Sequence, residues 1–336
     1  MQILERYSRQ IVLGRIGKTG QRKLLRSQVT VVGLGALGTM ISTLLARAGI
    51  GRLRLIDRDV VELVNLQRQI LYDEGDIGLP KAAVAADRIK RINSSIKVEG
   101  IAKDVNITNV LDLLDGSDVV VDGTDNLETR FVVNEACVEM GIPWVYGGAI
   151  GTEGRAMAIV PGKTACFRCF TKGPPSPGLL PTCETAGILN SVATATASLE
   201  VTEAIKLLLG DEPSGYMAVL DGWEPELLRI KVERSRTCPV CVGGKREYLG
   251  GRSPSVFSTL CGRSTVSFDP LHKGDLDMAA LARRLRKIGK VRRAGSIILL
   301  EVGGYGLTIF PDGRALIKGT EKEEVAKSLY SKYIGL

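Results

Sequence analysis

The sequence predicts an α/β fold: a Rossmann-like, doubly wound and mostly parallel sheet, an antiparallel extension, and a small C-terminal α+β module. Three observations support this class. Short β-branched runs alternate with helical patterns over the first 150 residues, a glycine-rich turn joins the first strand to the first long helix, and polar linkers precede the last 80 residues.

The first half contains five continuous apolar runs that predict strands. They lie at 28–33, 52–57, 96–101, 118–123 and 142–148, and helical patterns at 36–48 and 81–92 separate the first three. Apolar strands that alternate with helices form parallel sheets covered on both faces. Gly49 follows the first long helix, at the position where helices commonly end.

The pattern of predicted helices and strands changes after residue 150. We expect a strand at 155–160, a proline-rich loop at 173–181, a long helix at 187–209 and paired strands at 216–221 and 226–232. The predicted organisation is a large α/β domain at 1–245, with an arm at 1–27 and halves at 28–150 and 151–245. A linker at 246–254 precedes the module at 255–336.

The module is predicted to run strand, helix, strand, strand, helix. Met278, Leu281, Leu285 and Ile288 recur on one face of its first helix, and Gly289 is expected at the end of that helix. Thr320 and Glu323 have the spacing of a capping box at the start of the last helix.

Composition excludes several classes. The 336 residues contain 44% hydrophobic and 24% charged side chains, and no apolar run is long enough to span a membrane. No signal peptide is visible, so a cytoplasmic location is the expectation. His272 is the one histidine, which argues against triad chemistry with an imidazole base. The net charge of +8 is dispersed, apart from a basic cluster at 283–293.

The segment 33–38, Gly-Leu-Gly-Ala-Leu-Gly, follows a strand and opens a helix. Glycines there permit a tight turn and close approach of a nucleotide to the positive end of the helix dipole. Asp57 ends the next strand, where a ribose hydroxyl acceptor belongs. These features alone fit an NAD enzyme as well as an ATP enzyme.

The polar residues that follow favour ATP. Asn65, Gln67 and Arg68 form a polar segment, and Lys81 begins the next helix. An enzyme that stabilises departing pyrophosphate needs such cations, whereas a dehydrogenase does not. Asp122 and Asp125 end the fourth strand, where a carboxylate can hold Mg²⁺ between phosphates.

Two C-x2-C pairs, Cys166 with Cys169 and Cys238 with Cys241, predict one tetrahedral Zn²⁺ site. The pairs are far apart in the sequence, so the metal would cross-link distant segments of the antiparallel extension. Redox-active cysteine pairs are the weaker alternative, because no thioredoxin-like pattern surrounds them.

In family order, the segments RYSRQI (6–11), GLGALG, NLQRQ (65–69), DIGLPKA (76–82), DGTDN (122–126) and the cysteine pairs resemble the ThiF/MoeB/HesA family, relatives of the ubiquitin-activating enzymes. The resemblance covers about two-thirds of the chain. It implies a dimeric enzyme that joins AMP from ATP to the terminal glycine carboxylate of a ThiS/MoaD-type ubiquitin-like protein, in molybdopterin or thiamine biosynthesis.

The resemblance also implies residue roles. Asp57 would bind the ribose, Asn65, Arg68 and Lys81 would face the phosphates, and Asp125 would hold Mg²⁺. Arg9 would reach the site of the partner subunit in a homodimer. The full expected nucleotide set is Gly33, Gly35, Ala36, Gly38, Asp57, Asp59, Asn65, Gln67, Arg68, Lys81, Asp125 and Asn126. Ala36 departs from the glycine that the family often has.

Cys183 lies in the proline-rich loop just before a long helical pattern. A thiol near a helix N-terminus is more acidic, so Cys183 is the candidate acceptor for an activated acyl group. Cys137, inside an apolar helix, is expected in the core, and Cys261 is expected to be core filler.

Three alternatives stay open. The activated protein could pass through a Cys thioester into a conjugation cascade, with the C-terminal module as a recruiting element. Adenylation of a modified tRNA base would suit the positive charge, although the cysteine pairs favour a protein substrate over nucleic acid. A non-catalytic subunit would have no reason to keep Arg9, Arg68, Lys81 and Asp125 together.

Overall fold

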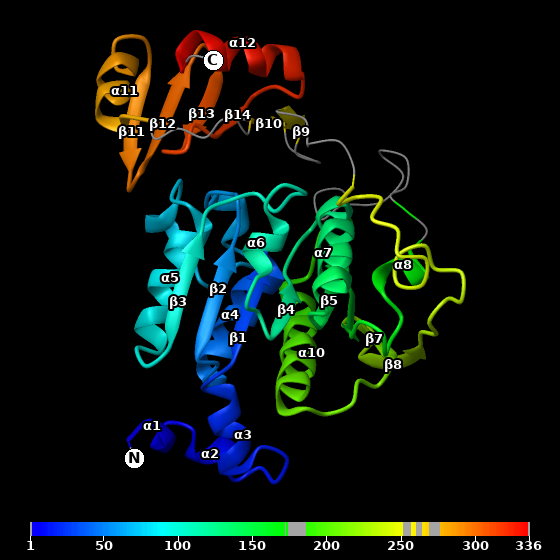
Figure 1. Ribbon diagram of the computed structural model, residues 1–336. Coiled ribbons are helices and arrows are strands. Elements are labelled where there is room, and N and C mark those ends of the chain that lie inside the picture. The colour runs from blue at the N-terminus through cyan, green and yellow to red at the C-terminus, as the bar shows by residue number, and fades with distance from the viewer. Residues whose placement is uncertain are drawn as a thin grey trace. The chain divides into compact units, whose positions relative to one another are not determined.

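The computed structural model describes residues 2–171, 173, 186–250, 257–259, 264–268 and 276–334. The chain divides into two compact units, Met1–Gly251 and Arg252–Leu336 (Figure 1). Each unit has its own sheet and its own buried core.

The first unit is built on an eight-stranded sheet with the order β3-β2-β1-β4-β5-β6-β7-β8. The first five strands are parallel, and β5 to β8 pair antiparallel, so the predicted mostly parallel sheet with an antiparallel extension is confirmed. The strands are β1 Gln28–Val32, β2 Arg52–Ile56, β3 Lys97–Ile101, β4 Val119–Asp122, β5 Trp144–Ile150, β6 Glu153–Ile159, β7 Tyr216–Asp221 and β8 Glu226–Lys231.

Helices cover both faces of the parallel part. The helices are α1 Gln2–Glu5, α2 Ser8–Ile11, α3 Gly17–Leu24, α4 Ala36–Ala48, α5 Lys81–Ile92, α6 Val110–Leu114, α7 Leu127–Met140, α8 Phe167–Phe170 and α10 Asn190–Leu209. Alternation along β4 shows the two layers: Val119 and Val121 pack with α4, α5 and α10, whereas Val120 packs with α6 and α7. No helix in the described ranges is long and apolar enough to cross a bilayer.

The N-terminal arm packs at the amino edge of the parallel strands. Tyr7 is buried, and its hydroxyl accepts from Asn93 just after α5. Gln10 donates to the carbonyl of Ala48 at the end of α4. Figure 1 shows α1 to α3 at this end of the sheet, while the strands point to the opposite edge.

The second unit has a six-stranded antiparallel sheet with the order β11-β12-β13-β14-β10-β9 and two helices. Its elements are β9 Phe257–Thr259, β10 Thr265–Phe268, α11 Met278–Leu285, β11 Lys290–Ala294, β12 Ile297–Val302, β13 Tyr305–Ile309, β14 Ala315–Lys318 and α12 Glu323–Tyr333. The α+β class is confirmed, and Leu281 and Leu285 of α11 are buried as expected. The prediction for Ile288 and Gly289 was wrong: α11 ends at Leu285, and Ile288 lies beyond it and is exposed.

Two further details of the module differ from the expectation. Four strands, not two, lie between α11 and α12, because tight turns at Gly295, Gly303 and Gly313, all with positive φ, fold the segment into a meander. The prediction of a capping box at Thr320 and Glu323 was wrong. Helix α12 begins at Glu323, after Lys322, and the hydroxyl of Thr320 accepts a hydrogen bond from the Lys322 amide instead.

Candidate active site and metal centre

The turn between β1 and α4 is packed backbone against backbone on the end of β4. Gly33 has a φ of +87°, and a Cβ there would lie 2.5 Å from the carbonyl oxygen of Gly123. A Cβ on Gly38 would lie 1.9 Å from the Gly33 carbonyl oxygen. These positions therefore require glycine, and the first amides of α4 stay open toward the carboxyl edge of the sheet.

Asp57 fixes this turn from the end of β2. One of its carboxylate oxygens accepts from the Leu34 amide at 2.6 Å, and the other accepts from the Asp59 amide at 2.7 Å. Burial raises the pKa of Asp57, and the ammonium of Lys81 opposes that shift. Each carboxylate oxygen keeps a free lone pair that can accept from a ribose hydroxyl.

Lys81 lies at the first position of α5 with its side chain only 3% exposed. Its Nζ is 3.4 Å from Oδ2 of Asp59. Among the described residues, this long ion pair is the one that the buried ammonium makes, and the ammonium lies at a helix N-terminus. Further negative charge from a ligand would therefore stabilise it.

The polar segment after β2 contains two buried amides with unused hydrogen-bonding atoms. Asn65 is fully buried; its Oδ1 accepts from the Glu62 amide, while its Nδ2 has no hydrogen-bond partner among the described residues. Gln69 is 3% exposed, and its Oε1 likewise lacks a partner there. A Cβ on Gly35 would lie 3.9 Å from Gln69 Nε2, so room remains between the turn and this segment.

Gln67 and Arg68 lie in the same segment. The Gln67 side chain is exposed, and its backbone carbonyl accepts from Asn190 at 3.3 Å. Arg68 donates to the carbonyl of Val64 at 2.9 Å. The guanidinium is half-buried and retains further N–H donors for an anion.

The turn after β4 is held by a charged side chain that the sequence did not single out. Arg130 of α7 donates from Nε to Asp122 at 2.8 Å, and its Nη2 donates to the carbonyls of Thr124 and Gly147, each at 2.7 Å. The other Asp122 oxygen accepts from the amide and hydroxyl of Thr124. Asp122 is therefore a buried structural carboxylate.

Asp125 follows this fixed turn and is exposed. Burial acts to lower the pKa of Arg130. Its neighbouring groups, foremost the negatively charged Asp122 and more weakly Asp125, outweigh burial and raise this pKa above its ordinary value. Asp125 therefore lies within electrostatic reach of the clamp, with its carboxylate accessible to a cation.

Glu200 is a second buried group that sequence reasoning missed. It is fully buried in α10, and neither carboxyl oxygen has a hydrogen-bond partner among the described residues. A Cβ on Gly147 would lie 2.1 Å from its carboxyl carbon, so the carboxyl packs directly on the β5 backbone. Burial, with a contribution from Asp122, raises the pKa of Glu200 well above its usual range, and Arg130 opposes the shift.

Two expected site residues lie outside this arrangement. Asn126 caps α7 by accepting from the Thr129 amide at 2.8 Å, so its side-chain oxygen already has a local role. Arg9 lies on α2, which packs at the carboxyl end of α4, whereas the glycine turn opens the amino end. A helix of this length separates the two by about 20 Å.

The four paired cysteines form one cluster. Their sulfurs all lie within 4.8 Å of one another, with Cys166 to Cys238 at 3.6 Å and Cys169 to Cys241 at 3.5 Å. Four sulfurs at 2.3 Å from a central Zn²⁺ would lie roughly 3.8 Å apart, so the donor set and its dimensions fit zinc. Burial raises the pKa of Cys169 to about 11, so the thiolates there need a cation.

The cluster ties the segment after β6 to the segment after β8. Cys166 precedes α8 and Cys238 follows β8, and both are buried beside Phe167 and Trp144. Cys137 lies in the core, as expected. Cys183 and Cys261 lie outside the described residues.

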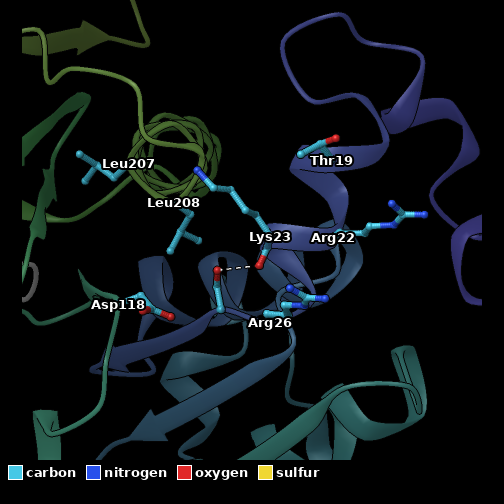
Figure 2. A pocket seen from close by; sticks show the side chains of 8 residues that line it. Thr19, Arg22, Lys23, Arg26, Asp118, Leu207 and Leu208 are labelled. Carbon is cyan, nitrogen blue, oxygen red and sulfur yellow. Dashed lines mark hydrogen bonds between the residues drawn. The ribbon is translucent and has the colours of Figure 1, made fainter.

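A surface hollow of about 660 Å³ lies at the opposite edge of the sheet (Figure 2). Arg22, Lys23 and Arg26 of α3 and Leu207 and Leu208 of α10 border it, with Asp118 just before β4. Lys23 donates across it to the carbonyl of Leu209 at 2.8 Å. The hollow is thus separate from the glycine turn, and none of the expected site residues lines it.

The geometry fits a nucleotide at the carboxyl edge. The glycine turn follows β1, Asp57 follows β2, Asn65 lies between β2 and α5, and the buried Lys81 begins α5. Arg130 was missed because its contacts depend on tertiary structure, although it lies only eight residues after Asp122 in the sequence. Gln69 was identified only as part of the polar NLQRQ segment.

Comparison with known proteins agrees with this arrangement. The sequence model described as "ThiF family" matches residues 7–240. A "Sulfur carrier protein ThiS adenylyltransferase" of Bacillus subtilis is 39% identical over 335 residues, which are 98% of this chain and 99% of the relative. A "SAMP-activating enzyme E1" of Haloferax volcanii is 40% identical over 72% of this chain and 90% of its own.

Among solved structures, Escherichia coli MccB with ATP has a TM-score of 0.63 at 27% identity, covering 71% of this chain and 74% of that one. The glycine turn, the polar segment with its lysine and the cysteine cluster all fall within the matched range, 7–240, or directly at its end. The chain belongs to the ThiF family.

Proposed function

We propose that this chain uses ATP to adenylate the C-terminal glycine carboxylate of a small ThiS/MoaD-type ubiquitin-like protein and releases pyrophosphate. Two buried donors near the glycine turn carry the proposal: the Lys81 ammonium, and Nδ2 of Asn65, which has no hydrogen-bond partner among the described residues. Both groups suit the phosphates of a nucleotide.

In this proposal each residue has a defined task. Asp57 accepts from the ribose, and the first amides of α4 face the α-phosphate region. Lys81, Asn65 and Arg68 hold the phosphate chain and stabilise charge on the departing pyrophosphate. Asp125 would hold Mg²⁺, which neutralises phosphate charge when bound.

The carboxylate of the carrier attacks the α-phosphorus, the bond to the β-phosphate oxygen breaks, and an acyl adenylate forms. The acid needs no proton removed at neutral pH, which agrees with the lack of histidine in the sequence of residues 1–251. Names of relatives support this class of substrate: the Bacillus subtilis and Escherichia coli proteins are named for ThiS, and the Haloferax volcanii protein for SAMP.

We also infer a homodimer in which Arg9 acts on the partner's site. Arg9 is exposed and lies at the edge of the sheet opposite its own glycine turn. Val12 is 80% exposed and Leu13 57% exposed next to it, so the arm presents apolar surface that a second copy could cover.

The test is ATP–pyrophosphate exchange driven by a small protein that ends in Gly-Gly. Asp125→Asn should lower the exchange rate at least ~100-fold, because the carboxylate is replaced by a neutral isostere. Asp112→Asn makes the same change on an exposed position of α6 and should leave the rate unchanged. Normal exchange in Asp125→Asn would remove Asp125 from the mechanism, and exchange driven by tRNA instead of the protein would overturn the proposal.

A further inference from the structure

The second unit carries most of the net charge of the chain. Residues 252–336 contain 15 Lys and Arg and 8 Asp and Glu, a net charge of +7, whereas residues 1–251 contain 30 and 29, a net charge of +1. Net charge of this density attracts acidic partners. The ThiF family model ends at residue 240, so this unit lies outside it.

Much of the charge lies in one short stretch. The basic corner comprises seven exposed side chains at the end of α11, in the turn after it and on β11: Arg283, Arg284, Arg286, Lys287, Lys290, Arg292 and Arg293. No Asp or Glu occurs between residues 283 and 293. The opposite side of α11 is buried through Leu281 and Leu285, so packing fixes the orientation of these charges.

Contacts within the module use only part of this charge. Arg284 donates to the carbonyls of Tyr333 and Ile334, each at 3.0 Å. Lys290 and Glu301 form a 3.8 Å pair with both side chains more than 70% exposed, a geometry worth little in water. Within the described parts of the chain, the side chains of Arg286 and Lys287 have neither an ion pair nor a hydrogen bond.

Ordinary structural roles explain only some of the seven cations in the basic corner. A helix C-terminus favours one or two positive side chains, and a lysine on an edge strand discourages aggregation. Seven cations in eleven residues exceed both needs, and placing them together costs mutual repulsion. The excess indicates a surface that meets negative charge.

β11 also provides a backbone edge. It is the terminal strand of the six-stranded sheet, and among the described strands it pairs only with β12. Its free side can therefore accept an added strand. Because side chains alternate along a strand, Lys290 and Arg292 lie on one face and Arg293 on the other, so cations flank both faces of this edge.

The surface suits a protein better than a single-stranded nucleic acid. Residues 283–293 contain no aromatic side chain, and Phe268, Phe310 and Tyr330 of the module are buried. Single-stranded nucleic acids bind through exposed aromatic rings on which bases stack. An acidic polypeptide needs only the cations and the strand edge.

We propose that the basic corner docks an acidic, extended segment of a protein partner, which adds to β11 as a strand and places its carboxylates against Arg286, Lys287 and Arg293. The partner is a protein other than the carrier. Three relatives named for activating carriers align over 71–72% of this chain and over 90–96% of their own lengths, whereas the Bacillus subtilis relative aligns over 98% of this chain. Proteins named for carrier activation thus occur both with and without a counterpart of this unit. The proposal stands independently of the adenylation chemistry.

The experiment uses the full-length protein and a fluorescent peptide of about ten residues with alternating Glu and Thr, the simplest acidic strand. Fluorescence anisotropy should show binding that weakens with salt. The triple variant Arg286→Glu, Lys287→Glu, Arg293→Glu should bind at least ~10-fold more weakly. The matched triple variant Lys322→Glu, Lys327→Glu, Lys332→Glu changes the net charge equally on α12 and should bind as the wild type does.

Two further probes separate the alternatives. The same peptide with alternate amides N-methylated keeps its charge but cannot pair as a strand, so it should bind at least ~10-fold more weakly. Equal binding of the methylated peptide, equal losses in both triple variants, or tighter binding of an oligonucleotide of matched charge would each overturn the proposal. Circular dichroism of both variants verifies that the module remains folded.

Discussion

Nε of Arg130 lies 2.8 Å from Oδ2 of Asp122, and the same guanidinium binds the backbone carbonyls of Thr124 and Gly147. One side chain thus joins the turn after β4 to the neighbouring strand β5. Both charged groups are buried, so little water can reach either charge to replace the ion pair. The clamp sets the position of the backbone that leads into Asp125.

We expect Arg130→Gln to lower the free energy of unfolding by about 3 kcal/mol, because it leaves the buried Asp122 carboxylate without its cation. Urea denaturation at pH 7.5 measures the change. Arg130→Lys keeps the charge but cannot make all three contacts, so its loss should be intermediate. The same stability in all three proteins would show that the clamp contributes nothing.

Glu200 should make stability depend on pH. Because burial raises its pKa in the folded protein, the folded state holds a proton that the unfolded chain releases above its usual pKa of about 4.3. Stability from this group is therefore present at low pH and is lost as pH rises through the range between the unfolded and folded pKa values.

Glu200→Gln removes that dependence with little change in shape. The variant should be more stable than the wild type by roughly 1 kcal/mol at pH 8, and the difference should shrink toward pH 5. Thermal unfolding at both pH values measures the difference. A constant difference at both pH values would show that Glu200 is ionised in the folded protein.

The fold could be predicted from sequence wherever local patterns are strong. The runs at 28–33 and 118–123 are β-branched and continuous, and Gly33 and Gly49 mark a turn and a helix end that the structure confirms. The four-cysteine cluster was also predictable, because its spacing carries the chemistry.

The rest depended on long-range contacts. The bonds from Arg130 to Gly147 and the packing of Glu200 on the same glycine join residues far apart in the sequence. No local pattern reports such contacts. The sequence predicted two strands where the structure has four, β11 to β14. Short antiparallel strands joined by glycine turns read as one continuous mixture of polar and apolar residues, in which the individual strands do not stand out.

The cysteine cluster should hold about one Zn²⁺ per chain. Cys238→Ser removes one of four ligands, so metal analysis should fall to a small fraction of the wild-type content and the melting temperature should drop by several degrees. Cys137→Ala is the matched control, since Cys137 is buried outside the cluster and its loss should leave zinc content unchanged. Full zinc content in Cys238→Ser would contradict a four-thiolate site.

Asn65→Asp replaces the unpartnered Nδ2 donor with an acceptor of the same shape. If this donor faces phosphate, the new negative charge should raise the KM for ATP at least ~10-fold, with a much smaller effect on the KM for the carrier protein. Initial rates of pyrophosphate exchange, measured once at varied ATP and once at varied carrier protein, give the two constants. A change confined to the carrier's KM would move Asn65 out of the nucleotide site.

The position of Arg9, at the sheet edge opposite its own glycine turn, allows a test that no single variant provides. Arg9→Ala and Asp125→Ala homodimers should both be inactive. In a mixed dimer, one site combines the intact Arg9 of one subunit with the intact Asp125 of the other. Random exchange of subunits makes half of the dimers mixed, each with one complete site, so activity should return to about a quarter of the wild-type value. If light scattering verifies dimers and mass spectrometry verifies exchange while activity stays absent, Arg9 does not act in trans.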